Sequence, residues 1–317
     1  MAMKQAIEAY ELLDSAAVTG QVVASVLRDR GLSADVQHLE GQQGETDVIR
    51  LTIPGTEGRQ RGGRAPTLGV IGFLGGIGAR PSRIGLVSDA DGAITALATA
   101  LKLADMRRAG DSLHGDVIVT THICPRAPTG PHHPVPFMYA PVDIGILVRA
   151  VTDPAMEAIV SVDTTRGNRI INYRGIAISP TVKEGYILRV SEDLLDLMEI
   201  VTGRPPVVFS VTTQDLTPYG NDVYHLNSIL QPATATSAPV VGLALTAEVA
   251  VPGSATGASQ ITDIEQAVRL CIEIAKAFGA GRCRFYDPEE WDRLIRLYGS
   301  LRHLQAPEPG RAPAARE

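Results

Sequence analysis

Three polar side chains stand where strands of the predicted sheet end, and their chemical types suit a metal ion. Asp89 lies in the segment SDADG, between an expected strand and an expected helix, while His122 and Asp163 end the strands VIVTT and AIVSV. In open α/β sheets, ligands bind in the crevice outside the carboxyl ends of the strands. Two carboxylates and an imidazole supply the oxygen and nitrogen ligands that zinc or manganese takes. The sequence therefore predicts a divalent-metal site made by Asp89, His122 and Asp163.

Helix capping is the simpler explanation for an aspartate that precedes a helix. Asp accepts hydrogen bonds from the free N–H groups of the first helical turn, so it is common at the N-cap. Asp91, the second aspartate of SDADG, is interpreted in this way. For Asp89 and Asp163 both explanations stay open, and His122 is interpreted as functional.

A proline-rich loop after His122 carries further candidates for proton transfer. The loop CPRAPTGPHHPVPFMYAP holds six prolines, which make it stiff and suit it to the rim of a site or to a subunit contact. It contains the pair His132 and His133, of which at most one can face a given site in an extended chain. Glu248 follows the strand VVGLALTA and is also at a strand end. One of these three residues is expected to transfer the proton; a surface loop with solvated histidines is the alternative.

The elements that must position these side chains alternate between strands and helices. Such alternation predicts an α/β fold with a mixed, largely parallel twisted sheet and helices on both faces. Strands are expected at residues 34–39, 47–53, 68–73, 84–87, 116–121, 144–148, 158–162, 176–178, 207–211 and 240–245. Helices are expected near residues 7–13, 20–31, 93–106, 191–202, 221–230, 262–278 and 288–301, the sixth opening with a capping box at Thr262 and Glu265. We expect one domain over residues 1–304 and a disordered tail over 305–317.

Composition excludes several classes of protein. The net charge of −6 argues against binding to nucleic acid, which needs clustered Lys and Arg. No apolar run approaches the roughly 20 residues that cross a bilayer, and the opening MAMKQAIEAYELL has no secretory h-region. Three cysteines without a CxxC pair suit a reducing compartment. We therefore expect a cytoplasmic protein that acts on a small molecule, and its many apolar residues with few aromatics predict a homo-oligomer.

Several segments resemble the di-zinc exopeptidase clan, which includes aminopeptidases and deacylases. The opening AYELLDSAAVTGQVVASVLRDRGLSADVQHLEG is similar to the start of that clan, and LVSDADGAITALATALKLADM to its bridging-aspartate motif, with Asp89 at the ligand position. AIVSVDTTRG resembles the strand with the third acidic ligand, here Asp163. The resemblance spans residues 5–279 and implies a three-layer α/β fold and a metal-dependent hydrolase.

The same segments depart from the clan where its other ligands stand. LGVIGFLGG lacks the His and Asp of the first metal motif, GDVIVTTHIC has His122 near the place of the paired glutamates, and VPGSATGAS lacks the terminal His. Each missing group removes a ligand or the base that activates water. SDADGAITALA and GDVIVTTHICPRAP more closely resemble the hallmark segments of a bacterial family known as domain of unknown function eleven seventy-seven.

These observations lead to a hydrolase of small amide or peptide-like substrates with an altered metal site. In this hypothesis Asp89, His122 and Asp163 are ligands, and His132, His133 or Glu248 transfers the proton. The alternatives are a non-catalytic or metal-free relative that binds a small molecule in the same crevice, and a lyase or isomerase on the same scaffold. The loss of the first metal motif favours these alternatives.

Overall fold

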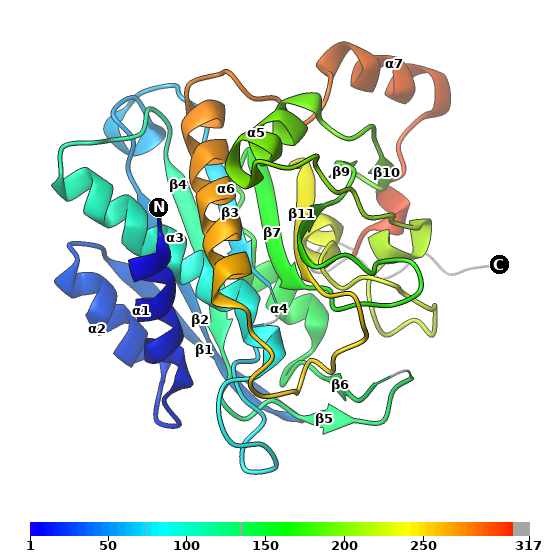
Figure 1. Cartoon of the computed structure of the whole chain (residues 1–317). Coiled ribbons are helices and arrows are strands. Elements are labelled where there is room, and N and C mark those ends of the chain that lie inside the picture. Colours follow the sequence, from blue (N-terminus) through cyan, green and yellow to red (C-terminus); the bar gives the residue numbers. More distant parts are fainter. Residues whose placement is uncertain (74, 134, 307–317) are drawn as a thin grey trace.

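A nine-stranded sheet forms the centre of the computed structural model, which describes residues 1–73, 75–133 and 135–306 (Figure 1). The strand order along the sheet is β1 (Ala34–Gly41), β2 (Gly44–Ile53), β4 (Val117–Ile123), β3 (Leu68–Gly72), β7 (Ala158–Thr164), β11 (Val240–Thr246), β9 (Val182–Lys183) and β10 (Tyr186–Ile187), and β8 (Gly175–Ile178) also pairs with β11. The four central strands, β4, β3, β7 and β11, are parallel, whereas the outer strands are antiparallel to their neighbours. Their carboxyl ends therefore lie at one edge of the sheet, as predicted for a largely parallel α/β sheet.

The central strands are apolar along most of their length because both faces of the sheet are covered. All residues of β3, β4 and β11 are buried, and so are the first six of β7. Buried residues on the two faces form separate clusters, one around Ile94 and Leu97, the other around Phe73, Leu147 and Ile229. A parallel sheet with this burial requires a layer of helices or loops on each side.

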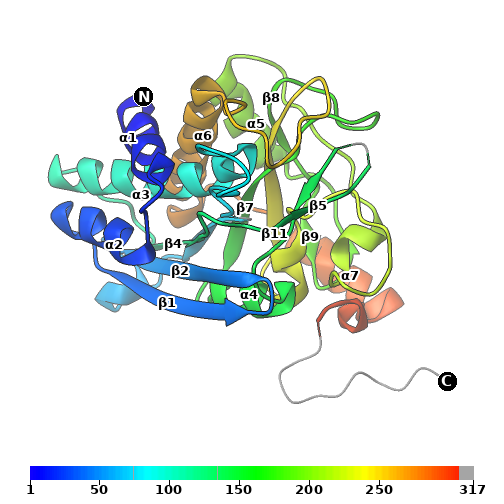
Figure 2. The same cartoon turned by 90° about the horizontal axis from the view of Figure 1, so that it is seen from below.

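Five helices cover one face and one helix covers the other, in the described part of the chain. The first group is α1 (Met3–Asp14), α2 (Gly20–Asp29), α3 (Asp91–Arg108), α5 (Glu192–Thr202) and α6 (Ile261–Gly279). The opposite face is covered by α4 (Ile144–Val151), together with a 3-10 turn, η4 (Gln231–Ala235). Figure 2 shows α1, α3 and α6 on one side of the strands and α4 on the other. The predicted three-layer α/β architecture is confirmed.

Three expected strands and one expected helix are wrong. Residues 144–148, expected as a strand, begin α4, because Asp143 caps the helix by accepting a hydrogen bond from the Ile146 N–H at 3.1 Å. Residues 84–87 and 207–211 make only isolated bridges, from Val87 to Thr256 and from Val208 to Ile178. Residues 221–230 form turns and bends instead of a helix. A short apolar run does not by itself distinguish a strand from a helix or an extended loop.

The predicted capping box of the sixth helix is also wrong. Helix α6 begins at Ile261, and its N-cap residue Gln260 makes no capping hydrogen bond through its side chain. Glu265 instead accepts hydrogen bonds from the Ala2 N–H at 2.9 Å and from Arg269 at 2.9 Å. A contact with the first residues of the chain has therefore replaced the local cap.

The last helix packs beside the β9–β10 end of the sheet, where Trp291 contacts Tyr186 of β10 with ring centroids 5.7 Å apart. Helix α7 (Pro288–Tyr298) has no buried residue and is followed by a 3-10 turn, η5 (Arg302–Leu304). Gln305 and Ala306 are still hydrogen-bonded to residues 233, 234 and 236, whereas the rest of the expected tail, 307–317, lies outside the described residues. No helix within residues 1–306, as far as they are described, is long and apolar enough to cross a bilayer.

Candidate functional site

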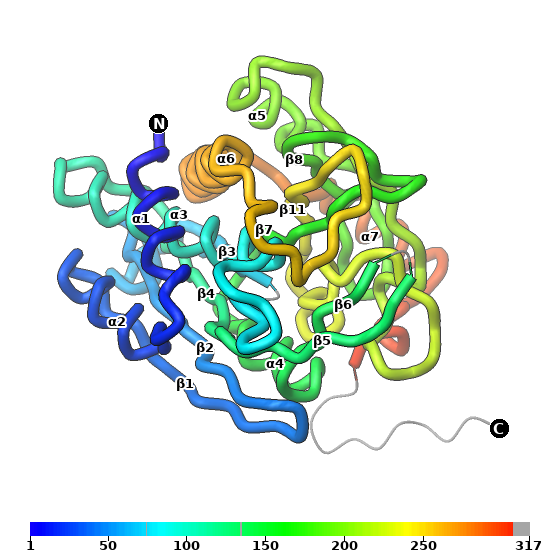
Figure 3. Tube along the Cα trace, turned by 60° about the horizontal axis from the view of Figure 1, so that its bottom comes forward, coloured from blue at the N-terminus to red at the C-terminus, as the bar shows by residue number. Residues whose placement is uncertain are grey.

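Loops from distant parts of the sequence meet at the carboxyl edge of the sheet. Figure 3 turns this edge forward and shows the loops that follow β3, β4 and β11 side by side. Bridges hold them together, between Gly76 and Cys124 and between Val87 and Thr256. Asp89 lies in the turn before α3 and Asp163 near the end of β7, and these are the two carboxylates that were predicted to converge at this edge.

Asp89 is a buried carboxylate without a hydrogen-bond donor in the described chain. It lies in the 3-10 turn η2 (Ser88–Ala90), 8% exposed, and its backbone N–H donates to the Gly253 carbonyl at 3.1 Å. Glycine is needed at position 253, because a Cβ there would lie 2.3 Å from Asp89 Oδ2. Burial, and then the negative charge of Asp91, raise the pKa of Asp89 to about 7. Such a carboxyl group readily takes either a proton or a cation.

Asp163 is the fully buried partner of Asp89. It lies near the end of β7 and accepts hydrogen bonds from the Ser228 hydroxyl at 2.7 Å and from the Thr164 N–H at 2.6 Å. Burial, and then the charge of Asp89, raise the pKa of Asp163 well above its usual range. The two carboxyl groups therefore repel each other unless a proton or a cation reduces their charge.

Asp91 does not cap its helix, contrary to the prediction. The N-cap of α3 is Ala90, which makes no capping hydrogen bond through its side chain, and the Asp91 carboxylate forms an ion pair with Arg166. Both side chains are buried, 0% and 4% exposed, and the Arg166 Nε–H donates to the Ser88 hydroxyl at 3.1 Å. Burial raises the pKa of Asp91 to about 6, although the charge of Arg166 opposes this shift. The ion pair fixes the start of α3 and, with it, the turn that carries Asp89.

His122 lies apart from this carboxylate pair. Gly72 of β3 pairs with Thr121 on one side and with Val162 on the other, so the next residue, Phe73, stands between His122 and Asp163. Two strand spacings put their backbones roughly 10 Å apart. The His122 ring is buried, its Nδ1 is 2.9 Å from the Thr46 hydroxyl, and its Nε2 has no partner in the described chain. Burial lowers the pKa of His122 to about 3, so the ring is neutral.

The predicted metal ligands thus separate into a carboxylate pair and a distant imidazole. Among the residues that the structure describes, no group of three or more His, Cys, Asp or Glu side chains could hold a metal ion. Two carboxylates without a histidine do not fit a tetrahedral zinc site. They fit a harder cation such as Mn²⁺ or Mg²⁺, which takes oxygen ligands and keeps several waters. The open carboxylate of Asp89 is the observation that supports this fit.

The three residues expected to transfer a proton are exposed. His132 and His133 lie between the short strands β5 (Thr129–Gly130) and β6 (Phe137–Met138), and the His132 ring packs 5.3 Å from that of Phe137. Glu248 lies in a bend just after β11. No hydrogen bond joins any of them to Asp89 or Asp163 in the described residues, so their catalytic roles, like the role of this loop in a subunit contact, stay predictions.

Two groups that support the site were missed from the sequence. Ser228 comes from a long loop organised by Asp215, which is fully buried and accepts hydrogen bonds from the Leu226 and Asn227 N–H groups at 2.7 and 2.9 Å. No local sequence pattern predicts that the Ser228 hydroxyl donates a hydrogen bond to Asp163. Arg166 could have been found, because it is a cation three residues beyond Asp163 in a strand-end loop.

Comparisons with known proteins agree with this architecture. The profile of the family described as "Protein of unknown function (DUF1177)" matches residues 37–308. A search of the curated proteins returns no match. Among solved structures, the fold is similar to the "Bottromycin maturation enzyme BotP in complex with Mn", with a TM-score of 0.50, 16% identity, and coverage of 88% of this chain and 71% of that chain. At this identity the likeness concerns the fold alone.

Proposed function

The chain belongs to the family described as Protein of unknown function (DUF1177), and from its fold and its carboxylate pair we propose that it is a metal-dependent hydrolase of small amide or peptide-like substrates. The carboxylate of Asp89 is the observation that carries the proposal. It is buried, raises the pKa of a second buried carboxylate, Asp163, through its charge, and receives no hydrogen bond from the described chain. Two coupled buried carboxyl groups are costly unless a cation or a proton reduces their charge.

Asp89 and Asp163 are the residues that would hold the metal, with manganese fitting better than zinc. When bound, such an ion polarises a carbonyl oxygen and makes a nearby water more acidic. Asp163 is oriented by the Ser228 hydroxyl and the Thr164 N–H, so its carboxylate has one fixed position. The ion pair of Asp91 with Arg166 holds the start of α3 and the preceding turn η2, which carries Asp89. His122 is left out of this ligand set because Phe73 separates it from Asp163.

Support for a hydrolase comes from the position of the pair. Its two aspartates occupy the places of the bridging and third acidic ligands in the exopeptidase resemblance, at the sheet edge where α/β proteins bind their ligands. The structural neighbour was solved with manganese, which is a property of that protein and is consistent with an oxygen-ligand site here.

A metal-free role is the second candidate, and the raised pKa values favour it. The pKa of Asp89 is about 7 and that of Asp163 is raised well above its usual range, so near neutral pH one of these coupled carboxyl groups can be protonated and the other ionised. In that state one group donates a hydrogen bond and the other accepts one, which suits binding of a small polar molecule or proton transfer in a lyase or isomerase. The absence of a three-residue ligand group in the described chain also favours this candidate.

Metal content and thermal stability distinguish the two candidates. In the metal-dependent case, protein purified without added metal contains a divalent ion by elemental analysis, and a chelator lowers its melting temperature. Asp89→Asn reduces the metal content several-fold. The wild-type protein releases amine from simple N-acyl amino acids or dipeptides, and chelation abolishes this release.

Asp143→Asn is the matched control. Asp143 caps α4, and Asn caps a helix about as well as Asp, so metal content and melting temperature should both stay at the wild-type values. A wild-type protein that carries no metal, and whose melting temperature does not respond to chelator or to added manganese or zinc, excludes the metal-dependent hydrolase and leaves the metal-free role.

A further inference from the structure

A cavity of about 540 Å³ opens at the opposite, amino-terminal edge of the sheet. It lies between the end of α4, the segments that lead into β7 and β11, and Lys183 at the end of β9. Its volume falls within the range of small-molecule sites, about 300–1,000 Å³. Neither Asp89 nor Asp163 lines it.

Lys183 contributes a buried ammonium group to the lining. The residue is 8% exposed, and its Nζ donates to the Ser237 carbonyl at 2.5 Å. The rings of Tyr286 and Trp291 lie 5.5 and 5.0 Å from Nζ, at distances typical of cation–π contacts. An ammonium group has three N–H donors, so neutral partners leave it both hydrogen-bonding capacity and charge.

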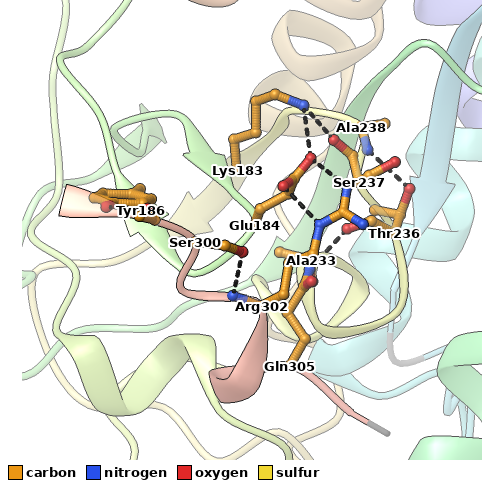
Figure 4. Close-up of polar contacts among 11 residues, drawn as sticks. Lys183, Glu184, Tyr186, Ala233, Thr236, Ser237, Ala238, Ser300, Arg302 and Gln305 are labelled. Carbon is orange, nitrogen blue, oxygen red and sulfur yellow. Dashed lines mark hydrogen bonds and ion pairs between the residues drawn. The ribbon is translucent and has the colours of Figure 1, made fainter. Parts of the chain in front are cut away.

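The nearest carboxylate is held more closely by another cation. Glu184 Oε1 is 3.5 Å from Lys183 Nζ, whereas its two oxygens accept from Arg302 at 2.7 and 2.9 Å (Figure 4). Burial, the largest influence, lowers the pKa of Lys183, although the charge of Glu184 opposes this shift. Lys183 therefore shares its counter-ion with Arg302, and its charge is only partly neutralised by Glu184.

The remaining charged groups of the lining reinforce this positive character. Arg149 is an exposed residue of the lining, and its guanidinium lies back along α4 beside Gly145, where an added Cβ would be 3.4 Å from Nη1; it makes no ion pair or hydrogen bond in the described chain. Glu157, the acidic residue of the lining, is engaged by Arg59 at 2.7 Å and by the Thr67 N–H at 2.8 Å. The cavity thus has one buried cation, Lys183, an exposed arginine at its rim that is free to turn toward it, and a carboxylate that is already paired.

The rest of the lining suits the body of an organic acid. Thr152, Thr236 and Ser237 supply hydroxyl groups, and Met156 and Tyr286 supply apolar surface. We propose that this cavity is a second small-molecule site, which binds the oxyanion of an organic carboxylate or phosphate at Lys183, with the exposed side chain of Arg149 turning toward the bound anion. The apolar part of the ligand packs against Met156 and Tyr286.

Titration calorimetry on the full chain tests the site with three probes that share a phenyl ring. Phenyl phosphate and phenylacetate carry the two oxyanions, and benzyl alcohol carries none. We expect at least one charged probe to bind one site per chain, and benzyl alcohol to bind at least ten-fold more weakly. The stronger of the two charged probes identifies the head group.

Arg149→Gln should weaken binding of the charged probe about ten-fold, which corresponds to 1.4 kcal/mol. Arg107→Gln is the matched control: Arg107 is exposed at the end of α3, does not line the cavity, and should leave the affinity unchanged. Lys183→Met should abolish binding. Because this variant changes a buried position and can fail to fold, Arg149→Gln is the deciding variant in that case.

Three outcomes overturn the proposal: no charged probe binds, benzyl alcohol binds equally well, or Arg149→Gln and Arg107→Gln have the same affinity. The test is independent of the proposed hydrolase, because Asp89→Asn should leave probe binding unchanged. Failure at one edge of the sheet therefore says nothing against the other.

Discussion

The two edges of the sheet bury charge of opposite sign. At the carboxyl edge, the carboxylates of Asp89, Asp91 and Asp163 are accompanied by one buried guanidinium, that of Arg166. At the amino edge, Lys183 is buried beside aromatic rings, and the carboxylates near it are engaged by arginines. Buried charge is costly unless it is paired, and the pairing is incomplete at each edge in a different sense. The carboxyl edge has an excess of carboxylates that a cation or a proton would neutralise, whereas at the amino edge Lys183 shares Glu184, its counter-ion at 3.5 Å, with Arg302.

The largest effect is expected where the carboxyl edge already has its cation. Arg166→Met leaves Asp91 buried and unpaired, which should lower the free energy of unfolding by about 3–5 kcal/mol. Urea denaturation at pH 8, followed by circular dichroism, measures the loss. Arg169→Met is the control, because Arg169 is exposed and should change stability by less than about 0.5 kcal/mol. Equal stability of the two variants would show that the ion pair contributes nothing to this edge.

The second prediction separates His122 from the carboxylates by the sign of its pH dependence. The pKa of His122 is about 3 in the folded protein against 6.5 when unperturbed, so the unfolded chain binds more protons between these values. Stability that is fully present above pH 6.5 is therefore lost as the pH falls toward 3, on the order of 5 kcal/mol in total. The carboxyl group of Asp89 has the opposite sign: its pKa is raised to about 7, so its contribution to stability increases as the pH falls from 7 toward 3.8.

Urea midpoints from pH 8 to pH 4 measure both contributions. His122→Phe should become more stable than wild type as the pH falls below 6.5. Asp89→Asn should be more stable than wild type at pH 8, because it removes a buried charge, and this difference should shrink as the pH falls and Asp89 is protonated in the wild type. If the urea midpoints of His122→Phe and of wild type change equally with pH across this range, the folded state does not depress the pKa of His122, and the ring is not buried behind Phe73.

A smaller effect is expected from the backbone that approaches Asp89. Gly253→Ala places a methyl group 2.3 Å from Asp89 Oδ2, so the carboxylate or the loop must move, at a cost of about 1–3 kcal/mol. The same change in an Asp89→Ala background should cost less than about 0.5 kcal/mol, because the carboxylate is gone. Equal costs in the two backgrounds, measured by urea denaturation, would show that the strain does not come from the contact between residue 253 and the Asp89 carboxylate.

The strand end that carries Asp163 could be predicted because it depends on a local pattern. The apolar run before it is long enough to be a buried strand, and an aspartate at the end of such a run lies at the edge of the layer. Asp89 was expected after a strand at residues 84–87, but it lies in a 3-10 turn after a segment that makes only an isolated bridge. The helices over residues 3–14, 20–29 and 91–108 were expected within a few residues, because apolar periodicity and glycine at helix ends act within the segment itself.

The partners of these side chains depended on the tertiary structure. Strand β3 lies between β4 and β7, so Phe73 separates His122 from Asp163, and no sequence pattern reports that order. Ser228 donates to Asp163 from 65 residues away, and Glu265 leaves its expected cap for the first residues of the chain. Hydrophobic periodicity decides which side chains are buried, but it does not decide which buried groups meet. Their charge states follow from those meetings, because desolvation and pairing are set by neighbours that packing brings from elsewhere in the chain.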